Sequence, residues 1–379
     1  MEIEIRGMRK RDWPAVSQLI ETEWEARHPV LDEDFFLWQH MGFGNLRGLA
    51  ATPLAFVEGT LVGMRGIIPG EYQLPRRGGG YEYASGGAFA MWIVANAHRG
   101  LGIGKQLLHY CDSQLPVMLA LGSNEKTSVP IYLKNGFSRL DGLNHWFAVL
   151  SNRANSLLYG AFQPGDLPKP ARPTPRGILH STDDAEYLSR VWERFSRANS
   201  VFSLHKKPEF WEWRYLNHPV FNHEILYNPK LDTFSVQRIE EVDTIDGPVR
   251  VLRILDLVTG RPEPKSLSYV EATTKFLELL LSKLQEDGVH AVDFRVSHRL
   301  FEEPLRNAGF HFMPAGVPPI DGPSFAGQLN PLRLNPSPIN LHWKTSELDG
   351  AQPVDLHFTK SDSDMDRPNT RGIRSRRLH

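Results

Sequence analysis

Cysteine is nearly absent from this chain of 379 residues, in which Cys111 is the only one. A single cysteine excludes an intrachain disulfide and a zinc site built from several cysteines, and we assign no metal site. The scarcity of cysteine fits a reducing compartment, so we expect a cytoplasmic protein.

An excess of charge of one sign is also missing. Lys and Arg number 43 and Asp and Glu 44, so the formal net charge is −1. That balance excludes a general attraction to polyanions, although local patches remain open, and we expect no nucleic-acid partner. Hydrophobic residues make up 41% and charged residues 23% of the chain, which excludes wholesale disorder.

Long hydrophobic runs are missing as well. The most apolar helical stretch, residues 276–284, is far too short to span a bilayer and contains Glu278 and Lys283. Residues 1–6 alternate charged and apolar side chains and lack the apolar centre of a signal peptide. We therefore expect no membrane insertion.

The length of the chain favours two domains, because one core of this size would be unusual. Residues 163–177 contain five prolines and predict a stiff linker between a first domain over 1–162 and a second over 178–345. Residues 346–379 are polar and end in several arginines. We expect a disordered, solvated tail there, with a basic docking segment as the alternative.

Short patterns of the first half recur in the second at almost one offset. Phe35 to Trp38 is echoed by Phe210 to Trp213 at an offset of 175, and Asp12 by Asp184 at 172. Gly136-Phe137 is likewise echoed by Gly309-Phe310 at 173. Three such matches indicate two copies of one fold.

The first half predicts a regular alternation of strands and helices. Asp12 can cap the opening helix, and turns are expected at Glu58-Gly59 and at residues 78–80. The expected strands cover residues 2–6, 88–94, 117–121 and 144–150, and a helix over 129–134 ends at Asn135-Gly136. Trp146 would close the first copy, as Trp343 would close the second.

The most informative segment runs from Trp92 to Leu108. A buried strand enters a turn whose glycines let the backbone approach a ligand, and a helix begins there with unpaired N–H groups, which makes an anion site. A P-loop is excluded by Arg99 and Gln106, and a dinucleotide fingerprint by the spacing of its last glycine. The remaining pattern is Arg-x-x-Gly-x-Gly, matched by Arg99, Gly102 and Gly104.

This pattern resembles the pyrophosphate loop of the GNAT superfamily of acyl-CoA-dependent N-acyltransferases. Val94 matches the family's valine five residues before the arginine, and residues 132–137 match its Tyr-x-x-x-Gly-Phe motif. The resemblance covers residues 1–150. It implies an α/β fold of two tandem GNAT-like domains, each a mixed, mostly antiparallel sheet flanked by helices. The second copy would be degenerate, because it has no counterpart of the glycine-rich turn.

The resemblance also implies a site for acetyl-CoA as the acyl donor. Backbone N–H groups of the turn would hold its pyrophosphate, and the strand before the turn would pair with its pantetheine arm. Tyr132 would be catalytic, donating a proton to the departing CoA thiolate. The residues predicted to bind the donor are Ile93, Val94, Arg99, Gly100, Leu101, Gly102, Ile103, Gly104, Lys105 and Asn124.

A general base is not evident. Residues 88–94 contain no carboxylate, whereas some family members carry a glutamate there. Glu82, expected on the preceding strand, and His98 are weak replacements, and a relay of water molecules is equally open. Cys111 fits packing within a helix better than nucleophilic catalysis. The implied reaction is direct attack of an amine on the thioester.

The acceptor implied is a small-molecule amine. An amino sugar or its nucleotide-linked precursor is suggested by the tandem layout and by the aromatic clusters at 35–38 and 210–213, for which core packing is the stronger alternative. Residues 205–207 and Arg214 could face a cleft between the copies or be solvated. A Fem-like aminoacyl transferase using charged tRNA and a non-catalytic CoA-binding protein remain alternatives, although the glycine-rich turn favours CoA.

Overall fold

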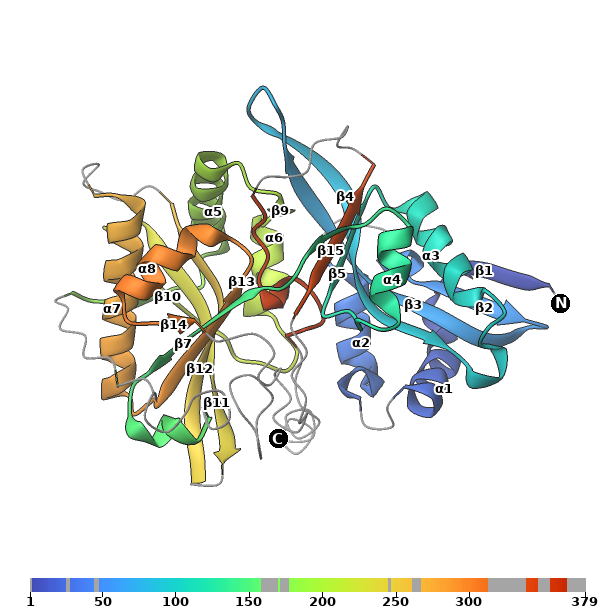
Figure 1. Ribbon diagram of the computed structural model, residues 1–379, viewed down its shortest axis with the longest axis horizontal. Coiled ribbons are helices and arrows are strands. Elements are labelled where there is room, and N and C mark those ends of the chain that lie inside the picture. Colours follow the sequence, from blue (N-terminus) through green and yellow to red (C-terminus); the bar gives the residue numbers. More distant parts are fainter. Residues whose placement is uncertain are drawn as a thin grey trace.

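The computed structural model describes residues 2–24, 28–43, 48–157, 170, 177–244, 247–260, 267–312, 339–346 and 355–366. Two mixed sheets lie side by side, each flanked by helices, as the two ends of the molecule in Figure 1 show. This is the α/β architecture that the sequence predicts. In the described residues no helix combines the length and the apolar character needed to cross a membrane.

The first sheet is built mainly from the first half of the chain. Its strands follow the order β1-β2-β3-β4-β5-β15-β6, with β9 pairing on β3. The elements of this half are β1 (Ile3–Gly7), α1 (Trp13–Glu23), α2 (Glu33–Met41), β2 (Pro53–Val57), β3 (Thr60–Pro75), β4 (Tyr81–Val94), α3 (Ile103–Gln114), β5 (Val117–Leu121), α4 (Ser128–Lys134), β6 (Ser138–Leu140) and β7 (Asn144–Val149). The predicted turn at Glu58-Gly59 is confirmed, with φ of 50° and 79°.

The second sheet follows the order β14-β7-β13-β12-β11-β10-β8. Its half contains β8 (His180–Ser181), α5 (Ala185–Asn199), β9 (Ser203–Leu204), α6 (Pro208–Trp211), β10 (Glu224–Asn228), β11 (Thr233–Thr244), β12 (Gly247–Thr259), α7 (Tyr269–Glu286), β13 (Ala291–Val296), α8 (Glu302–Asn307), β14 (His311–Phe312) and β15 (Leu341–Thr345). A π-helical turn, η7 (Glu212–Leu216), follows α6. From α5 to β14 these elements follow the same order as those from α1 to β6, apart from β9 and η7.

Helices cover both faces of the first sheet because its strands point apolar side chains to both faces. Neighbouring residues of a strand point to opposite faces, so Leu54 packs with Val16 and Phe36 of α1 and α2, while Ala55 packs with Leu107 of α3. This arrangement fixes the start of α3 against the end of β4, where the glycine-rich turn lies.

Strands β7 and β15 are exchanged between the two sheets, as Figure 1 shows. In β7, Trp146 pairs with Phe294 of β13, and in β15, Trp343 pairs with Leu119 of β5. The prediction that residues 144–150 close the first sheet and the strand of Trp343 the second is therefore wrong. Both strands are apolar and fit either sheet, so the local pattern could not choose between them.

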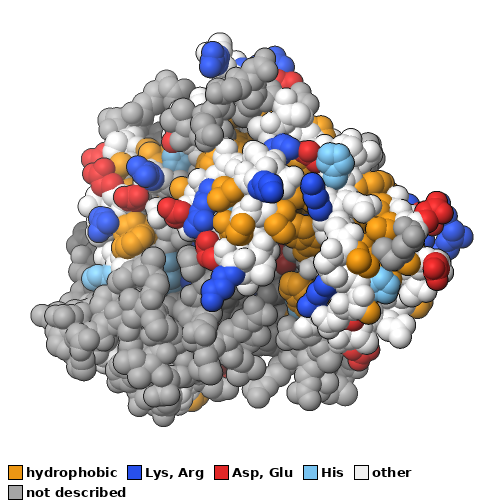
Figure 2. Space-filling model, turned by 45° about the vertical axis from the view of Figure 1, so that its right-hand side comes forward, with side chains coloured by type: hydrophobic (Ala, Val, Ile, Leu, Met, Phe, Trp, Pro, Cys, Tyr) orange, Lys and Arg blue, Asp and Glu red, His pale blue; other side chains and the backbone are white. Residues whose placement is uncertain are grey.

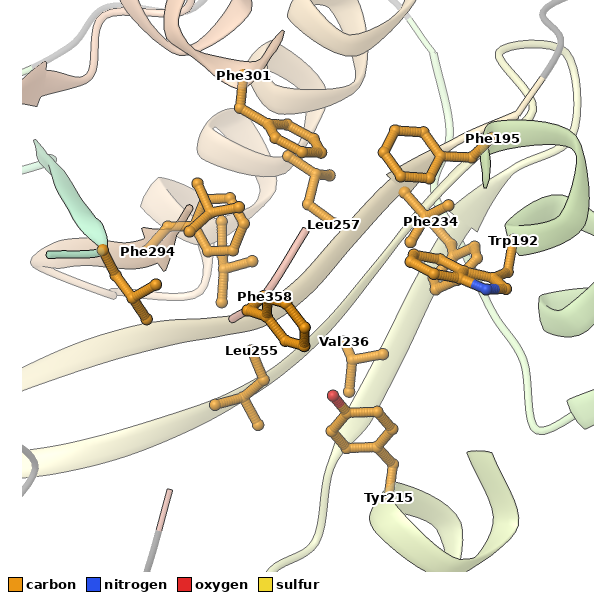
Figure 3. Close-up of a cluster of buried hydrophobic side chains, with 14 of the residues drawn as sticks. Trp192, Phe195, Tyr215, Phe234, Val236, Leu255, Leu257, Phe294, Phe301 and Phe358 are labelled. Carbon is orange, nitrogen blue, oxygen red and sulfur yellow. The ribbon is translucent and has the colours of Figure 1, made fainter. Parts of the chain in front are cut away.

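Residues 355–366 correct a second prediction, since this part of the expected tail is packed between other elements. Phe202 donates its backbone N–H to the Asp355 carbonyl at 2.9 Å, and Ser297 donates to the Phe358 carbonyl at 2.9 Å. The ring of Phe358 is fully buried among aromatic and aliphatic side chains of the second half (Figure 3). Apolar groups in a polar segment supply the driving force. Most of the predicted linker and the terminal arginines lie outside the described residues.

Two of the basic residues expected either at a cleft or at a solvated helix start are buried, whereas Lys207 is the N-cap of α6 with its side chain 43% exposed. Lys206 is buried and makes ion pairs with Asp256 and, at 3.3 Å, with Asp362. Arg214 is buried too, and its Nη2 donates to the Ser363 carbonyl at 2.9 Å. Both cations therefore hold residues 355–366 against the second half.

Candidate active site

An open strand edge lies beside the glycine-rich turn. Strand β4 pairs in parallel with β5 only from Gly86–Val117 to Phe89–Ala120, although β4 continues to Val94. Opposite β3, two residues of β4, Ala90 and Met91, face the single Gly66, which makes a β-bulge. Beyond Phe89, β4 therefore has no strand on its β5 side among the described residues.

The hydrogen-bond ladder determines which backbone groups reach that edge. Ala95 donates its N–H to the Val62 carbonyl at 2.8 Å, and bonded pairs alternate along an antiparallel ladder. Ile93 thus turns its backbone groups toward β3, whereas Trp92 and Val94 turn theirs to the open edge. Of the two strand residues predicted to bind the donor, only Val94 presents its N–H there, and Trp92 is the neighbour that the sequence analysis missed.

The carbonyl of Val94 already has a partner. Arg99 folds back so that its Nε donates to this carbonyl at 3.0 Å. The five-residue spacing between the valine and the arginine therefore closes the loop around η4 (Asn96–His98). Arg99 remains exposed at the surface.

Two glycines shape the turn itself. Gly100 and Gly102 have φ of 81° and 77°, and a Cβ built on either would meet no atom within 4 Å. Gly102 is the N-cap of α3 and supplies no side-chain bond, so the first N–H groups of α3 are free to bind an anion. These N–H groups lie at the positive end of the helix dipole, which favours the binding of a negatively charged group.

The neighbouring residues of the turn take different positions. Leu101 and Lys105 are exposed, whereas Ile103 is buried under α3. A Cβ on Gly104 would lie 3.3 Å from Nε1 of Trp92. A side chain at position 104 would therefore crowd this indole, which would have to shift slightly.

The equivalent helix of the second half begins differently. Ser268 caps α7 by accepting from the Glu271 N–H at 3.1 Å, and the Glu271 carboxylate accepts from the Ser268 N–H at 2.8 Å. This capping box satisfies the helix start with the chain's own groups. An anion would have to displace a carboxylate there, which it does not have to do at α3.

Tyr132 is buried on α4, close to the open edge. Its ring stacks on Trp92 at 5.8 Å between centroids, and its hydroxyl accepts a hydrogen bond from Nη2 of Arg65. Burial raises the pKa of Tyr132, while the positive charge of Arg65 opposes that rise. The phenol therefore keeps its proton at neutral pH and is available as an acid.

Arg65 is a residue that the sequence analysis did not single out. It lies on β3 and is 3% exposed, with its guanidinium 4.2 Å from the Phe89 ring and 4.8 Å from the Trp92 ring. No carboxylate among the described residues forms an ion pair with it. The only signal was a charged residue inside an apolar strand. His342 of β15 also approaches Tyr132, at 5.6 Å between ring centroids.

The remaining predicted site residues have other contacts. Asn124 accepts from the N–H groups of Lys126 and Thr127 at 2.9 and 3.1 Å, so its side-chain oxygen holds the turn before α4. Glu82 was expected on the strand before the one with the open edge. It lies instead near the start of that same strand, at the hairpin end far from the glycine-rich turn. Cys111 is buried, which raises its pKa to about 12 and agrees with a packing role.

The two aromatic clusters pack against each other. Trp38 and Trp213 stack at 5.0 Å between centroids, and Phe35, Phe36, Phe210 and Trp211 are buried. The core interpretation of these clusters is therefore correct, which removes one reason to expect a sugar acceptor. On the face of the molecule shown in Figure 2, basic and acidic side chains are interspersed with hydrophobic ones.

Comparison with known proteins agrees with this geometry. The profile of the acetyltransferase (GNAT) family matches residues 13–137, which include the glycine-rich turn and Tyr132. No curated protein matches the chain in sequence.

Solved structures share the fold over most of the chain. A GCN5-related N-acetyltransferase from Anabaena variabilis is 13% identical, with a TM-score of 0.54. The match covers 82% of this chain and 70% of the Anabaena chain. One from Kribbella flavida is 12% identical, with a TM-score of 0.53 and coverage of 91% and 72%. A probable N-acyltransferase from Enterococcus faecalis is 11% identical, with a TM-score of 0.53 and coverage of 92% and 74%.

The family match gives the class of protein, which is an acyltransferase. More particularly, residues 13–137 match the model of the acetyltransferase (GNAT) family. Enzymes of this family generally take the acyl group from acetyl-CoA or another acyl-CoA.

Proposed function

We propose that the protein is an acetyl-CoA-dependent N-acetyltransferase that acts on a small amine. The observation that carries this proposal is the open edge of β4, which leads directly into the uncapped start of α3. A pantetheine arm can pair with the backbone of Trp92 and the N–H of Val94 along this edge while the N–H groups after Gly102 hold the pyrophosphate.

The reaction is direct attack of the amine nitrogen on the thioester carbonyl carbon. The C–N bond forms, the C–S bond breaks, and the sulfur leaves with the electron pair. The nitrogen gives up one proton to water, since no general base is evident among the described residues. A free N–H at the open edge supports the oxyanion of the intermediate. Tyr132, kept protonated by burial, donates its proton to the departing sulfur, and Arg65 stabilises the phenolate that remains.

We further propose that the two halves are copies of one fold and that only the first binds the donor. The shared element order supports the duplication, as does the parallel pairing of β12 with β13 in the position of β4 with β5. The capping box at the start of α7 supports the loss of donor binding in the second half. The predicted domain limits, 1–162 and 178–345, remain the boundaries we propose, with β7 and β15 exchanged across them.

The test is a thermal-shift titration of the full chain with acetyl-CoA, beside NAD, ATP and buffer. A ligand at 100 times its dissociation constant stabilises a protein by about 2.7 kcal/mol, which for a domain of this size moves Tm by several degrees. A shift with acetyl-CoA alone, followed by release of CoA with an amine, is the expected result. If the protein binds acetyl-CoA but does not release CoA with any amine tested, it is a binding protein. If acetyl-CoA causes no thermal shift, the donor site is contradicted.

A further inference from the structure

The exchanged strand β15 brings a buried amide next to the candidate site of the first half. β15 lies between β5 and β6 (Figure 1), and Asn340 is the residue directly before it. Asn340 is fully buried, and its backbone carbonyl accepts the Gly122 N–H at 2.8 Å. Asn340 therefore lies beside the turn that follows β5 and leads into α4, the helix of Tyr132.

The side-chain amide of Asn340 holds this turn at three points. Its Oδ1 accepts the Ser123 N–H at 2.7 Å, and its Nδ2 donates to the Ser123 carbonyl at 2.9 Å. Nδ2 also donates to the Glu125 carboxylate at 2.7 Å. A carboxamide has two N–H groups to donate, so both are bound to residues 123–125. Asn340 thus fixes both backbone groups of a residue that lies 217 positions earlier in the chain.

An ion pair holds the same turn from the outside. The Glu125 carboxylate accepts from both terminal nitrogens of Arg139 on β6, at 3.0 Å each, but Glu125 is 43% exposed. An exposed ion pair contributes little to stability, whereas a buried polar group that loses its partner is costly. The amide of Asn340 is therefore the contact that decides the conformation of Ser123.

The side chain of Ser123 acts on the phenol of Tyr132. Burial is the largest influence on the pKa of Tyr132 and raises it, while the charge of Arg65 and a hydrogen bond from the Ser123 side chain lower it. With Arg65 and Ser123 as donors to the phenolic oxygen, the phenol's own proton points elsewhere. Both donors also stabilise the phenolate that remains when the proton has left.

We propose that Asn340 is a positioning residue for the general acid. By fixing the backbone of Ser123, it directs the Ser123 hydroxyl to the oxygen of Tyr132. The second half thus completes the active site of the first half through the exchanged strand, although its own helix start is capped. This inference rests on the proposed function, since it concerns the acid of the same reaction.

The first experiment measures the ionisation of Tyr132 and needs no acceptor. The full chain is labelled with 3-fluorotyrosine, and the fluorine resonance that is missing from Tyr132→Phe is followed as the pH rises. We expect this resonance to titrate at a higher pH in Ser123→Ala and in Asn340→Ala than in the wild type, because the phenolate loses a donor in both. Ser123→Thr keeps the hydroxyl and should titrate like the wild type.

An unchanged titration in both alanine variants overturns the inference. A shift in Ser123→Ala without one in Asn340→Ala also overturns it, because the serine would then reach Tyr132 without the amide. Asn340→Ser, which is smaller but still polar, takes the place of Asn340→Ala if that protein does not fold.

Asn228→Ala is the matched control. Asn228 is also buried and holds a turn of the second half, because its Oδ1 accepts the N–H groups of Lys230 and Leu231 at 3.1 Å each. Its Nδ2 donates to the Ile178 carbonyl at 3.1 Å. Loss of this amide should lower stability, as loss of Asn340 does, and leave the titration of Tyr132 as it is in the wild type. An equal shift in Asn228→Ala would show that general loosening moves Tyr132, which contradicts positioning.

The second experiment compares kcat with and without the phenol. With an amine that the wild type acetylates, Ser123→Ala and Asn340→Ala should each lower kcat about 10-fold, while KM for acetyl-CoA stays nearly unchanged. In the Tyr132→Phe background neither change should lower kcat further, because both act through the phenol. A merely structural role would add its loss to that of Tyr132→Phe, and such additive losses overturn the inference.

Donor binding separates this inference from the proposed function. The thermal shift with acetyl-CoA should be the same in the wild type, Ser123→Ala and Asn340→Ala. Its absence from the wild type removes the proposed function, whatever the titration of Tyr132 shows. Its presence, together with a titration that does not respond to Ser123 and Asn340, removes only the positioning role.

Discussion

Trp38 and Trp213 bond to each other reciprocally. Each indole N–H donates to the backbone carbonyl of the other residue at 3.1 Å, and the rings stack at 5.0 Å between centroids. The two residues occupy matching places in the repeated sequence pattern. Such a self-complementary contact is what two equivalent surfaces make across an approximate two-fold axis. It supports the proposal that the halves are copies of one fold.

This pair predicts a measurable coupling. Trp38→Phe and Trp213→Phe each remove one indole hydrogen bond, and each should lower the free energy of unfolding by about 0.5–1.5 kcal/mol. The loss of unfolding free energy in the double variant should differ from the sum of the two single losses by ~0.5 kcal/mol or more, because the stacked rings share one site. Urea unfolding of the four proteins measures this energy, and strict additivity would show that the two bonds are independent.

The glycine-rich turn predicts a selective loss of donor binding. Gly102→Glu places a carboxylate where the pyrophosphate is expected, and we predict that the thermal shift with acetyl-CoA disappears. Gly59→Glu is the matched control, because Gly59 also has a positive φ, of 79°, and no atom within 4 Å of a built Cβ. Both variants carry similar backbone strain, so equal shifts in the two proteins would remove the turn from the donor site.

The role of Tyr132 predicts a change in kcat. Tyr132→Phe removes the acid, and kcat should fall about 100-fold or more while KM for acetyl-CoA stays nearly unchanged. Tyr110→Phe, on α3, is the control and should leave kcat unchanged. Since burial raises the pKa of Tyr132, loss of its proton should not limit the wild-type rate below about pH 10. A Tyr132→Phe enzyme with full kcat would exclude the phenol as the acid.

The burial of residues 355–366 predicts a large effect on stability. Phe358→Ala empties a fully buried site and should lower the free energy of unfolding by about 3–5 kcal/mol. Phe312→Ala removes a ring that is 42% exposed and should cost far less. Chemical denaturation of both variants measures the difference. Equal, small effects would mean that the segment is solvated, as its composition suggests.

Buried histidines predict a loss of stability in weak acid. Burial lowers the pKa of several histidines to about 4, namely His40, His223, His298, His342 and His357. Between pH 6.5 and 4 the unfolded chain binds protons that the folded chain refuses, so stability falls as the pH drops. Each such histidine contributes ~1.4 kcal/mol per pH unit.

Urea unfolding at pH 7, 6 and 5 measures this slope. His40→Gln should reduce it by the share of one histidine, because that ring is fully buried with Nδ1 2.8 Å from the Ile67 carbonyl. His109→Gln changes an exposed side chain and should leave the slope as it is. A wild-type stability that does not change with pH would contradict neutral, buried imidazoles.

Local features of the sequence were sufficient for the first sheet and for the turn. The hairpin at Glu58-Gly59, the strand over 117–121 and the helix ended by Gly136 all depend on neighbouring residues, and each is present in the structure. No local pattern predicted that Arg65 belongs to the candidate site. The contact of Arg65 with Tyr132 joins positions 67 residues apart, which no local pattern encodes.

The sequence by itself determined the order of helices and strands, the repeated pattern and the glycine-rich turn, because these follow from periodicity, glycine and the spacing of a few side chains. Only the tertiary structure decided where β7 and β15 pair and where residues 355–366 lie. An apolar strand or a short segment with one phenylalanine can pack against several surfaces, and the choice depends on contacts between residues far apart in the chain. Those contacts also bring Arg214 and Asp362 beside β4, the strand with the open edge.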